Sequence, residues 1–210
     1  MKTRVVVVDD HASIRQMLAI VLAREGPYEV VGEAGTGFEA MRVCRKLKPQ
    51  MVVLDLILPE LNGVDVLRNL RDEKLDSRFV VYSGVQNRAL IVDALQARPH
   101  GFVHKSDPLS TLCEALHAVQ KGCCYFTPFA AKFMDESRFP TTRVLLTDRE
   151  RAVLQMIAEG KSNKEMASRF SIAPKTVEHY RAHVMQKLDM HDVATLTRYA
   201  VSLGLVEAER

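Results

Sequence analysis

VVVVDD, residues 5–10, decides the fold, because a run of four valines ends there in two acidic residues. Three later stretches have the same form: MVVLD at 51–55, FVVYS at 79–83 and GFVHK at 101–105. Short runs rich in β-branched residues, separated by helical patterns, are typical of parallel strands. We therefore expect an α/β domain built on a parallel sheet, with each run as one strand.

Every one of these strands ends at a polar side chain. The carboxyl ends of parallel strands meet at one edge of an open sheet, which is where ligands bind. Three crowded carboxylates repel one another, and a hard divalent cation such as Mg²⁺ would relieve that repulsion. A lysine and a hydroxyl beside the metal suit a phosphoryl group. The residues expected to converge are Asp9, Asp10, Asp55, Ser83 and Lys105.

The intervals between the strands show helical periodicity, and Tyr28–Glu33 is expected to form a further strand. The resulting β/α repeats are enough for one domain with a hydrophobic core. Asp107 is expected to cap the last of these helices, with Pro108 at its first position. The expected helices are Ser13–Glu25, Thr36–Leu47, Val64–Glu73, Asn87–Ala97 and Asp107–Lys121.

Residues 1–122 resemble the receiver domain of two-component response regulators. The matching pieces are the Asp9-Asp10 pair, Asp55 at the end of the third strand, Pro59 and Gly63 just after it, Ser83, and Lys105. The resemblance implies a flavodoxin-like, doubly wound fold with five parallel strands in the order 2-1-3-4-5. It also implies that Mg²⁺ lies beside an aspartate that accepts a phosphoryl group from a sensor histidine kinase.

The same resemblance implies a role for each residue of the pocket. Asp55 would be the phosphoacceptor, Ser83 would move to bond the phosphoryl oxygen, and Lys105 would pair with it. Phe102 matches the aromatic switch position of receivers, and simple core packing is the alternative for it. The implied Mg²⁺ ligands are Asp10, Asp55 and the backbone carbonyl of Ile57, with Asp9 acting through water.

The pattern changes after Gly122. Residues 123–142 hold prolines around one short helical stretch, Pro128–Glu136, and are expected to form a linker. Residues 143–210 are expected to form a small all-α domain of four helices. Its helices are expected to open at the capping boxes of Thr147 and Ser162, at Pro174 for a helix reaching Leu188, and at Asp192 for one reaching Leu203.

Two helices joined by a tight turn, the second longer and basic, are the helix-turn-helix signature. Between Lys161 and Lys187 there are six Lys or Arg and two Glu residues, a local charge of 6 − 2 = +4. A basic face on such a motif is typical of phosphate contact, although a charge run alone is usually just surface.

Residues 146–178 resemble the LuxR-type DNA-binding domain, in the segments LTDRE (146–150), IAEGKSNKE (157–165) and PKTVE (174–178). Receiver and LuxR-type domain together are similar to the NarL/FixJ family, which controls transcription by phosphorylation. In Pro174–Leu188 the apolar side is expected to be Val177, Tyr180, Val184 and Leu188. Glu178, His179 and Ala182 match positions that face the major groove, while Lys175, Thr176, Arg181, His183 and Lys187 are better placed for phosphates or the groove edge.

Composition fits a soluble protein. The chain has 210 residues, a net charge of +3 and 47% hydrophobic residues, and no apolar run approaches the ~20 residues that span a bilayer. The N-terminus enters a strand at once, so no signal peptide is expected. The four cysteines, Cys44, Cys113, Cys123 and Cys124, lack the paired spacing of metal ligands and fit a reduced compartment. We therefore expect a cytoplasmic location.

The sequence thus predicts a transcription regulator controlled by phosphorylation, and not an enzyme in the usual sense. Its expected partners are a cognate histidine kinase, double-stranded promoter DNA, a second copy of the chain when phosphorylated, and RNA polymerase. Two alternatives remain: a Mg²⁺-dependent aspartyl phosphohydrolase, and a protein-interaction module that no longer binds DNA. For the dimer face, Asn87–Lys121 and Asp192–Leu203 both remain candidates.

Overall fold

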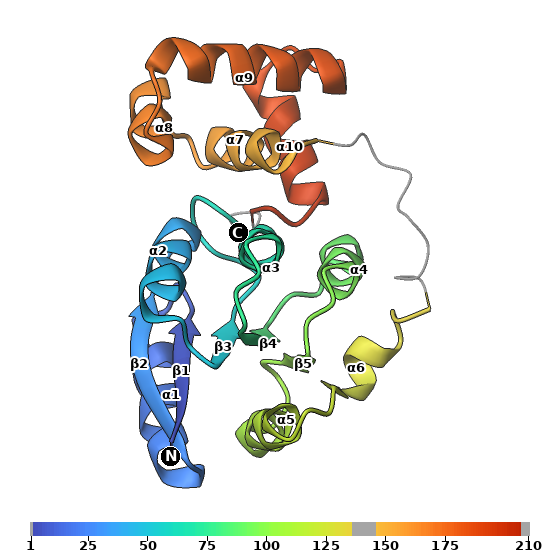
Figure 1. Ribbon diagram of the computed structural model, residues 1–210. Coiled ribbons are helices and arrows are strands. Elements are labelled where there is room, and N and C mark those ends of the chain that lie inside the picture. The colour runs from blue at the N-terminus through green and yellow to red at the C-terminus, as the bar shows by residue number, and fades with distance from the viewer. Residues whose placement is uncertain (1, 136–145, 207–210) are drawn as a thin grey trace.

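A computed structural model describes residues 2–135 and 146–206 of the chain. An α/β unit with a sheet between two helical layers forms one end of the molecule, and a unit of four helices is stacked upon it (Figure 1). No helix in the described ranges is long and apolar enough to cross a membrane.

The sheet is parallel throughout. Its strands lie in the order β2-β1-β3-β4-β5-β6, so the order expected for the first five is confirmed and a sixth strand is added at the edge. The bounds are β1 Thr3–Val8, β2 Tyr28–Ala34, β3 Met51–Leu54, β4 Arg78–Ser83, β5 Gly101–His104 and β6 Tyr125–Phe126.

Alternation along the strands builds two apolar layers. Val5 and Val7 pack with α1 (Ala12–Glu25) and α5 (Leu109–Gln120) on one face. Val6 and Val8 pack on the other face with α2 (Gly37–Leu47), α3 (Gly63–Asp72) and α4 (Arg88–Gln96). Because both faces are covered, each strand is a nearly continuous apolar run, and the polar residues gather at the strand ends.

Two local expectations were wrong. Asp107 does not cap α5: the capping residue is Pro108, which was expected at the first helical position and whose ring has no acceptor atom. Asp107 Oδ2 accepts from His104 N at 3.1 Å instead. The helix expected over Pro128–Glu136 is shorter, because α6 covers only Pro128–Ala131. The region expected to be a linker with a short helix also contains β6, which pairs with β5; its residues 136–142 lie outside the described ranges.

The four-helix unit follows its local signals closely. Its helices are α7 Asp148–Ala158, α8 Asn163–Phe170, α9 Pro174–Leu188 and α10 Val193–Ser202. Both expected capping boxes are present, at Thr147 with Glu150 and at Ser162 with Glu165. Short polar signals of this kind act within one turn of helix, which is why they could be recognised in sequence.

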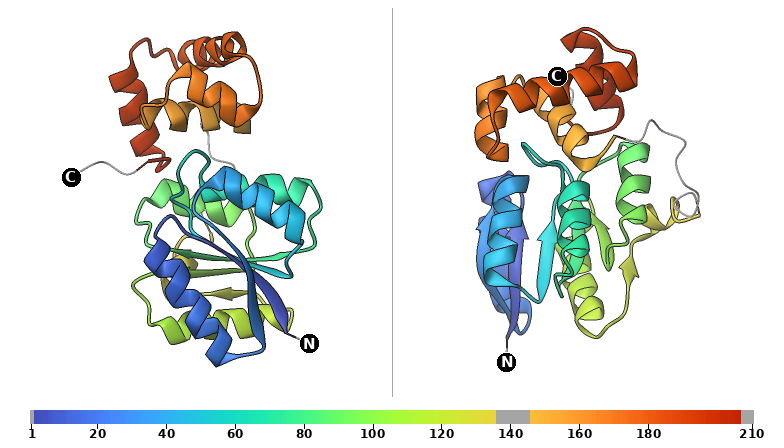
Figure 2. Two further views of the ribbon diagram at one scale, coloured as in Figure 1. Left: turned by 90° about the vertical axis from the view of Figure 1, so that its left-hand side faces the viewer. Right: turned by 45° about the horizontal axis from the view of Figure 1, so that its top comes forward.

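The two units share one apolar cluster and several polar contacts. Helix α7 lies over α3 and the loop before it, and α9 lies on the side of its unit that faces away from the sheet (Figures 1 and 2). At the end of α10, the carbonyl of Ser202 accepts from Asn87 Nδ2 at 3.2 Å. The recognition surface expected on α9 is therefore not covered by the α/β unit.

Gly63 is expected to be a sensitive position for stability. A methyl group there would overlap the carbonyl oxygen of Asp55 and lie 2.8 Å from Leu56 Cα. We expect Gly63→Ala to lower the free energy of unfolding by roughly 1–3 kcal/mol, as overpacking does. Urea denaturation would measure this change. Gly84→Ala is the control, because its added methyl group would meet nothing closer than 3.9 Å; equal losses for both variants would contradict the packing argument.

Candidate functional site

The expected polar pocket forms at the carboxyl ends of β1, β3, β4 and β5. Asp55, which directly follows β3, is buried and held from several sides. Ser83 Oγ donates to Asp55 Oδ1 at 2.5 Å, and Lys105 Nζ lies 2.5 Å from Asp55 Oδ2. The backbone N–H groups of Leu56 and Ile57 also donate to Oδ1, at 2.6 and 3.2 Å. The pocket therefore fixes one carboxylate with four donors.

The acid pair forms the other side of the pocket. Asp9 is buried and its Oδ2 lies 2.7 Å from Lys105 Nζ, whereas Asp10 is more exposed. His11 Nδ1 lies 2.6 Å from Asp10 Oδ1, and the three side chains of residues 9–11 offer ligand atoms within 4.8 Å of one another. The sequence analysis missed His11, although a metal-binding side chain directly after an acid pair was a readable signal.

Charge in this pocket is unbalanced. Burial by itself would lower the pKa of Lys105, but the charges of Asp55 and Asp9 outweigh it and raise that pKa above its ordinary value. One ammonium group thus faces two buried carboxylates, with Asp10 beside them. Carboxylate oxygens are the ligands that Mg²⁺ prefers, so the donor set and its excess negative charge both fit that ion.

Two further residues of the expected pocket lie in the core and in the loop after Asp55. Phe102 is fully buried in the core cluster on the face of α2, α3 and α4. Burial fits core packing, and the switch role of Phe102 stays a prediction. Ile57 lies in the loop directly after Asp55, so its carbonyl belongs to the same edge of the sheet.

Helix α9 presents its expected polar residues to solvent. Val177 and Val184 are buried, and Tyr180 and Leu188 are partly buried, which confirms the expected apolar side. On the remaining surface Arg181 is partly buried. The other expected contact residues are exposed: Lys175, Thr176, Glu178, His179, Ala182, His183 and Lys187.

Lys187 differs from the other basic residues of α9. Its Nζ lies 2.7 Å from Oε2 of Glu150, the buried acid of the α7 capping box. Burial would raise the pKa of Glu150, but the bonds from Lys187 and Thr147 lower it below its ordinary value. Lys187 therefore links α9 to the start of α7, a structural contact that the sequence analysis did not anticipate.

A charged contact joins the two units. Arg151 of α7 lies 3.3 Å from Asp65 of α3 and 2.8 Å from Asp93 of α4. Burial raises the pKa of Asp65, although the charge of Arg151 opposes the rise. At Asp93, which is less enclosed, burial is outweighed by Arg151 and Arg68, and the pKa falls. The two candidate dimer faces also touch each other, through Asn87 and Ser202.

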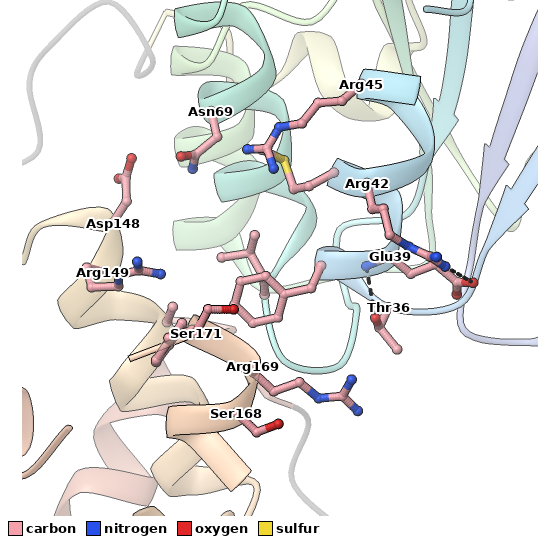
Figure 3. A pocket seen from close by; sticks show the side chains of 15 residues that line it. Thr36, Glu39, Arg42, Arg45, Asn69, Asp148, Arg149, Ser168, Arg169 and Ser171 are labelled. Carbon is pink, nitrogen blue, oxygen red and sulfur yellow. Dashed lines mark hydrogen bonds and ion pairs between the residues drawn. The ribbon is translucent and has the colours of Figure 1, made fainter. Parts of the chain in front are cut away.

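Beside this contact a cleft of about 1030 Å³ opens between α2 and the four-helix unit (Figure 3). Most of its arginines already have carboxylate partners: Arg42 lies 3.7 Å from Glu39, Arg45 lies 2.5 Å from Glu73, and Arg169 lies 2.6 Å from Glu60. Arg149 stacks on the Phe170 ring with 4.5 Å to its centroid. Because these charges are compensated inside the protein, we assign no ligand to the cleft.

A phosphoacceptor-like pocket joined to a helix-turn-helix unit defines the class of response regulators, and the comparisons agree. Residues 5–117 match the response regulator receiver domain, and residues 144–200 match the bacterial regulatory proteins of the luxR family. The chain belongs to the NarL/FixJ family of two-component response regulators.

Relatives match along nearly the whole chain. A Pseudomonas aeruginosa protein named as a transcriptional regulator is 36% identical over 201 residues, covering 94% of this chain and 97% of the relative. The nitrate/nitrite response regulator NarL of Escherichia coli is 31% identical over 192 residues, 89% of each chain.

Solved structures show the same fold. A LuxR-family two-component response regulator from Aurantimonas sp. SI85-9A1 has a TM-score of 0.60 at 31% identity, covering 66% of this chain and 99% of that one. An RcsB–DNA complex has a TM-score of 0.61 at 22% identity and covers 97% of this chain and 100% of that one.

Removing the Lys105 ammonium should destabilise the protein. We expect Lys105→Met to cost about 3 kcal/mol of the free energy of unfolding, because it leaves two buried carboxylates without a cation. The raised pKa of Lys105 means that this contribution is complete below the unfolded lysine pKa of about 10.4 and is lost as pH rises through the folded value.

Denaturation of both proteins across a pH series would measure this difference. The exposed Lys46→Met is the control and should change stability little. A gap between wild type and Lys105→Met that persists unchanged well above the raised lysine pKa would contradict the assignment of the stabilisation to the ammonium charge.

Proposed function

We propose that this chain controls transcription through phosphorylation of Asp55 by a sensor histidine kinase. The observation that supports the proposal most strongly is the buried Asp55 carboxylate with Ser83 Oγ and Lys105 Nζ each at 2.5 Å. A hydroxyl and an ammonium group next to a carboxylate are the donors that a phosphoryl group needs once it is attached there.

In the proposed transfer, an Asp55 carboxylate oxygen forms a bond to the phosphorus of a phosphohistidine. The P–N bond breaks, its electron pair returns to the imidazole, and solvent supplies the proton that the ring regains. Ser83 and Lys105 then bond the phosphoryl oxygens. Asp9, Asp10, Asp55 and the Ile57 carbonyl would hold Mg²⁺, which when bound supplies positive charge to the transferring group.

The proposed output is DNA binding by α9. Its exposed residues Lys175, Thr176, Glu178, His179, Ala182 and His183, with Arg181 beside them, form the proposed contact surface, whereas Lys187 is already paired with Glu150. The structures of RcsB bound to DNA, including one of two RcsB dimers, support this proposal by their shared fold. The recognition helix of such motifs lies in the major groove.

The remaining partners and the division of the chain are also proposals. We propose a receiver at 1–122, a linker at 123–142 and a DNA-binding domain at 143–210, acting in the cytoplasm with a cognate kinase, promoter DNA and RNA polymerase. The phosphorylated protein is proposed to form a homodimer, since two copies of α9 would read two half-sites.

Asp55→Asn should abolish phosphorylation. The amide keeps the shape of the carboxylate but lacks its nucleophilic oxygen, so labelling by a small phosphodonor such as phosphoramidate with Mg²⁺ should fall to background. Asp72→Asn, an exposed aspartate on α3, should label like the wild type. Labelling at wild-type level in Asp55→Asn would refute the assignment.

The same labelling experiment separates the regulator from a phosphohydrolase. A receiver takes up at most one phosphoryl group per chain, whereas sustained release of phosphate over many rapid turnovers would indicate the aspartyl phosphohydrolase.

Glu178→Ala should relax sequence preference at one base pair by ~1–3 kcal/mol, because a glutamate in the major groove can accept from the cytosine amino group. The alternative is that Glu178 orients a neighbouring Arg or Lys. Within the described ranges, Glu178 forms no ion pair with either kind of residue. Competition binding on single-base site variants would measure the effect, and equal losses on every variant would exclude direct base reading.

Lys175→Ala is the matched comparison, since a phosphate contact should weaken binding on all sequences and flatten the salt slope by about one unit. If the wild-type protein gave no salt-dependent gel shift with promoter DNA, the interaction module would be the better description.

A further inference from the structure

The loop Leu56–Asn62, which joins Asp55 to α3, is held at its far end by the DNA-binding domain. Gln155 of α7 donates from Nε2 to the Leu58 carbonyl at 2.7 Å, and its Oε1 accepts from Asn62 N at 2.8 Å. Glu159, one turn further on at the C-cap of α7, accepts from Glu60 N at 2.9 Å. Three backbone groups of the loop thus depend on side chains from the other domain.

These contacts are enclosed. Gln155 and Asn62 have no exposed surface, and Glu60 is 4% exposed. Leaving a buried backbone group without a partner is costly, so the loop conformation is specific to the docked arrangement. Glu60 also has a φ of 70°, in the left-handed region, and its side chain pairs with Arg169 of α8 at 2.6 Å. A non-glycine residue in that region needs such support.

The near end of the same loop is bound to the phosphoacceptor. The N–H groups of Leu56 and Ile57 donate to Asp55 Oδ1. A loop of seven residues therefore connects the Asp55 carboxylate to Gln155 and Glu159, with buried polar contacts at both ends. Arg151 holds α7 in this position through its contacts with Asp65 and Asp93. Asp65 lies on α3, which directly follows the loop, and Asp93 lies on α4.

We infer that Gln155 and Glu159 are positioning residues for the phosphoacceptor pocket, and that docking of α7 stabilises the unphosphorylated pocket. The inference rests on the proposed role of Asp55. In the docked arrangement Ser83, Lys105 and the N–H groups of Leu56 and Ile57 all bond the unmodified carboxylate. A phosphoryl group on Asp55 draws these donors toward its own oxygens and moves the start of the loop.

Coupling of this kind is reciprocal. If docking opposes phosphorylation, phosphorylation must weaken docking by the same factor. The DNA-reading face of α9 points away from the receiver in the docked arrangement, so the regulated event is the release of α7 and not the uncovering of α9.

The test compares full-length wild type, Gln155→Ala and Glu159→Ala, with Gln186→Ala as control. Gln186 is an exposed residue of the same type in the same domain. Two quantities are measured: the rate of labelling by phosphoramidate with Mg²⁺, and the hydrogen exchange of the amides of residues 56–62. Circular dichroism establishes that each variant is folded. Glu159→Ala removes the acceptor of Glu60 N and of Gln155 Nε2 at the partly exposed C-cap of α7, and it serves if Gln155→Ala does not fold.

We expect Gln155→Ala to label about fivefold faster or more, the lower end of typical coupling between sites, and Glu159→Ala to label faster by a smaller factor. Exchange in residues 56–62 should rise in both variants without phosphodonor, and should rise in the wild type on phosphorylation. Gln186→Ala should match the wild type in both measurements.

If hydrogen exchange in residues 56–62 were unchanged in both variants, the claim that α7 holds the loop would be wrong. Faster exchange with an unchanged or slower labelling rate would overturn the coupling. Absence of Asp55 labelling in the wild type would instead refute the proposed function, while the exchange comparison without phosphodonor would still decide whether α7 holds the loop.

Discussion

The Lys105 ammonium group, 2.5 and 2.7 Å from two buried carboxylates, is the interaction on which the active edge of this protein depends. A parallel sheet covered on both faces places its polar strand ends at one edge, where three acids would repel one another without a cation. Lys105 compensates only part of that charge. The pocket therefore keeps an excess of negative charge beside hydroxyl and ammonium donors, a combination that fits a divalent cation and a phosphoryl group.

The second organising contact is between domains. Arg151 contacts two aspartates on different helices of the receiver, and Gln155 and Glu159 bond the loop that follows Asp55. The contacts use α7, α8 and the end of α10, so α9 remains open. They also occupy parts of both candidate dimer faces, through Asp93 and through Asn87 with Ser202. A dimer built on those parts would have to compete with the contacts inside one chain.

Much of the fold could be predicted because its signals are local. Apolar runs ending in polar side chains predicted four strands and the Tyr28–Glu33 pattern a fifth, while the resemblance to receivers predicted their order. The capping boxes of Thr147 and Ser162 located two helices. Local reasoning was wrong where a competing contact won, as at Asp107, whose carboxylate bonds back to His104 N and leaves the cap to Pro108. The short strand β6 exists only because β5 offers an edge to pair with, which no pattern in Tyr125–Phe126 announces.

The pocket could be predicted by residue type, and its surroundings could not. Asp55, Ser83 and Lys105 stand at strand ends, so topology alone brings them together. Gln155 lies about a hundred positions away from its partners in the loop, and its role depends on how two domains meet. These contacts between the domains have a consequence for the design of chimaeric response regulators. A receiver fused to a foreign output module would keep its linker but lose the side chains that bond Leu58, Glu60 and Asn62. Chimaeras that preserve only the domain boundary would therefore contain a loop with three backbone groups that lack hydrogen-bond partners. Transferring α7 together with the receiver would restore those hydrogen bonds.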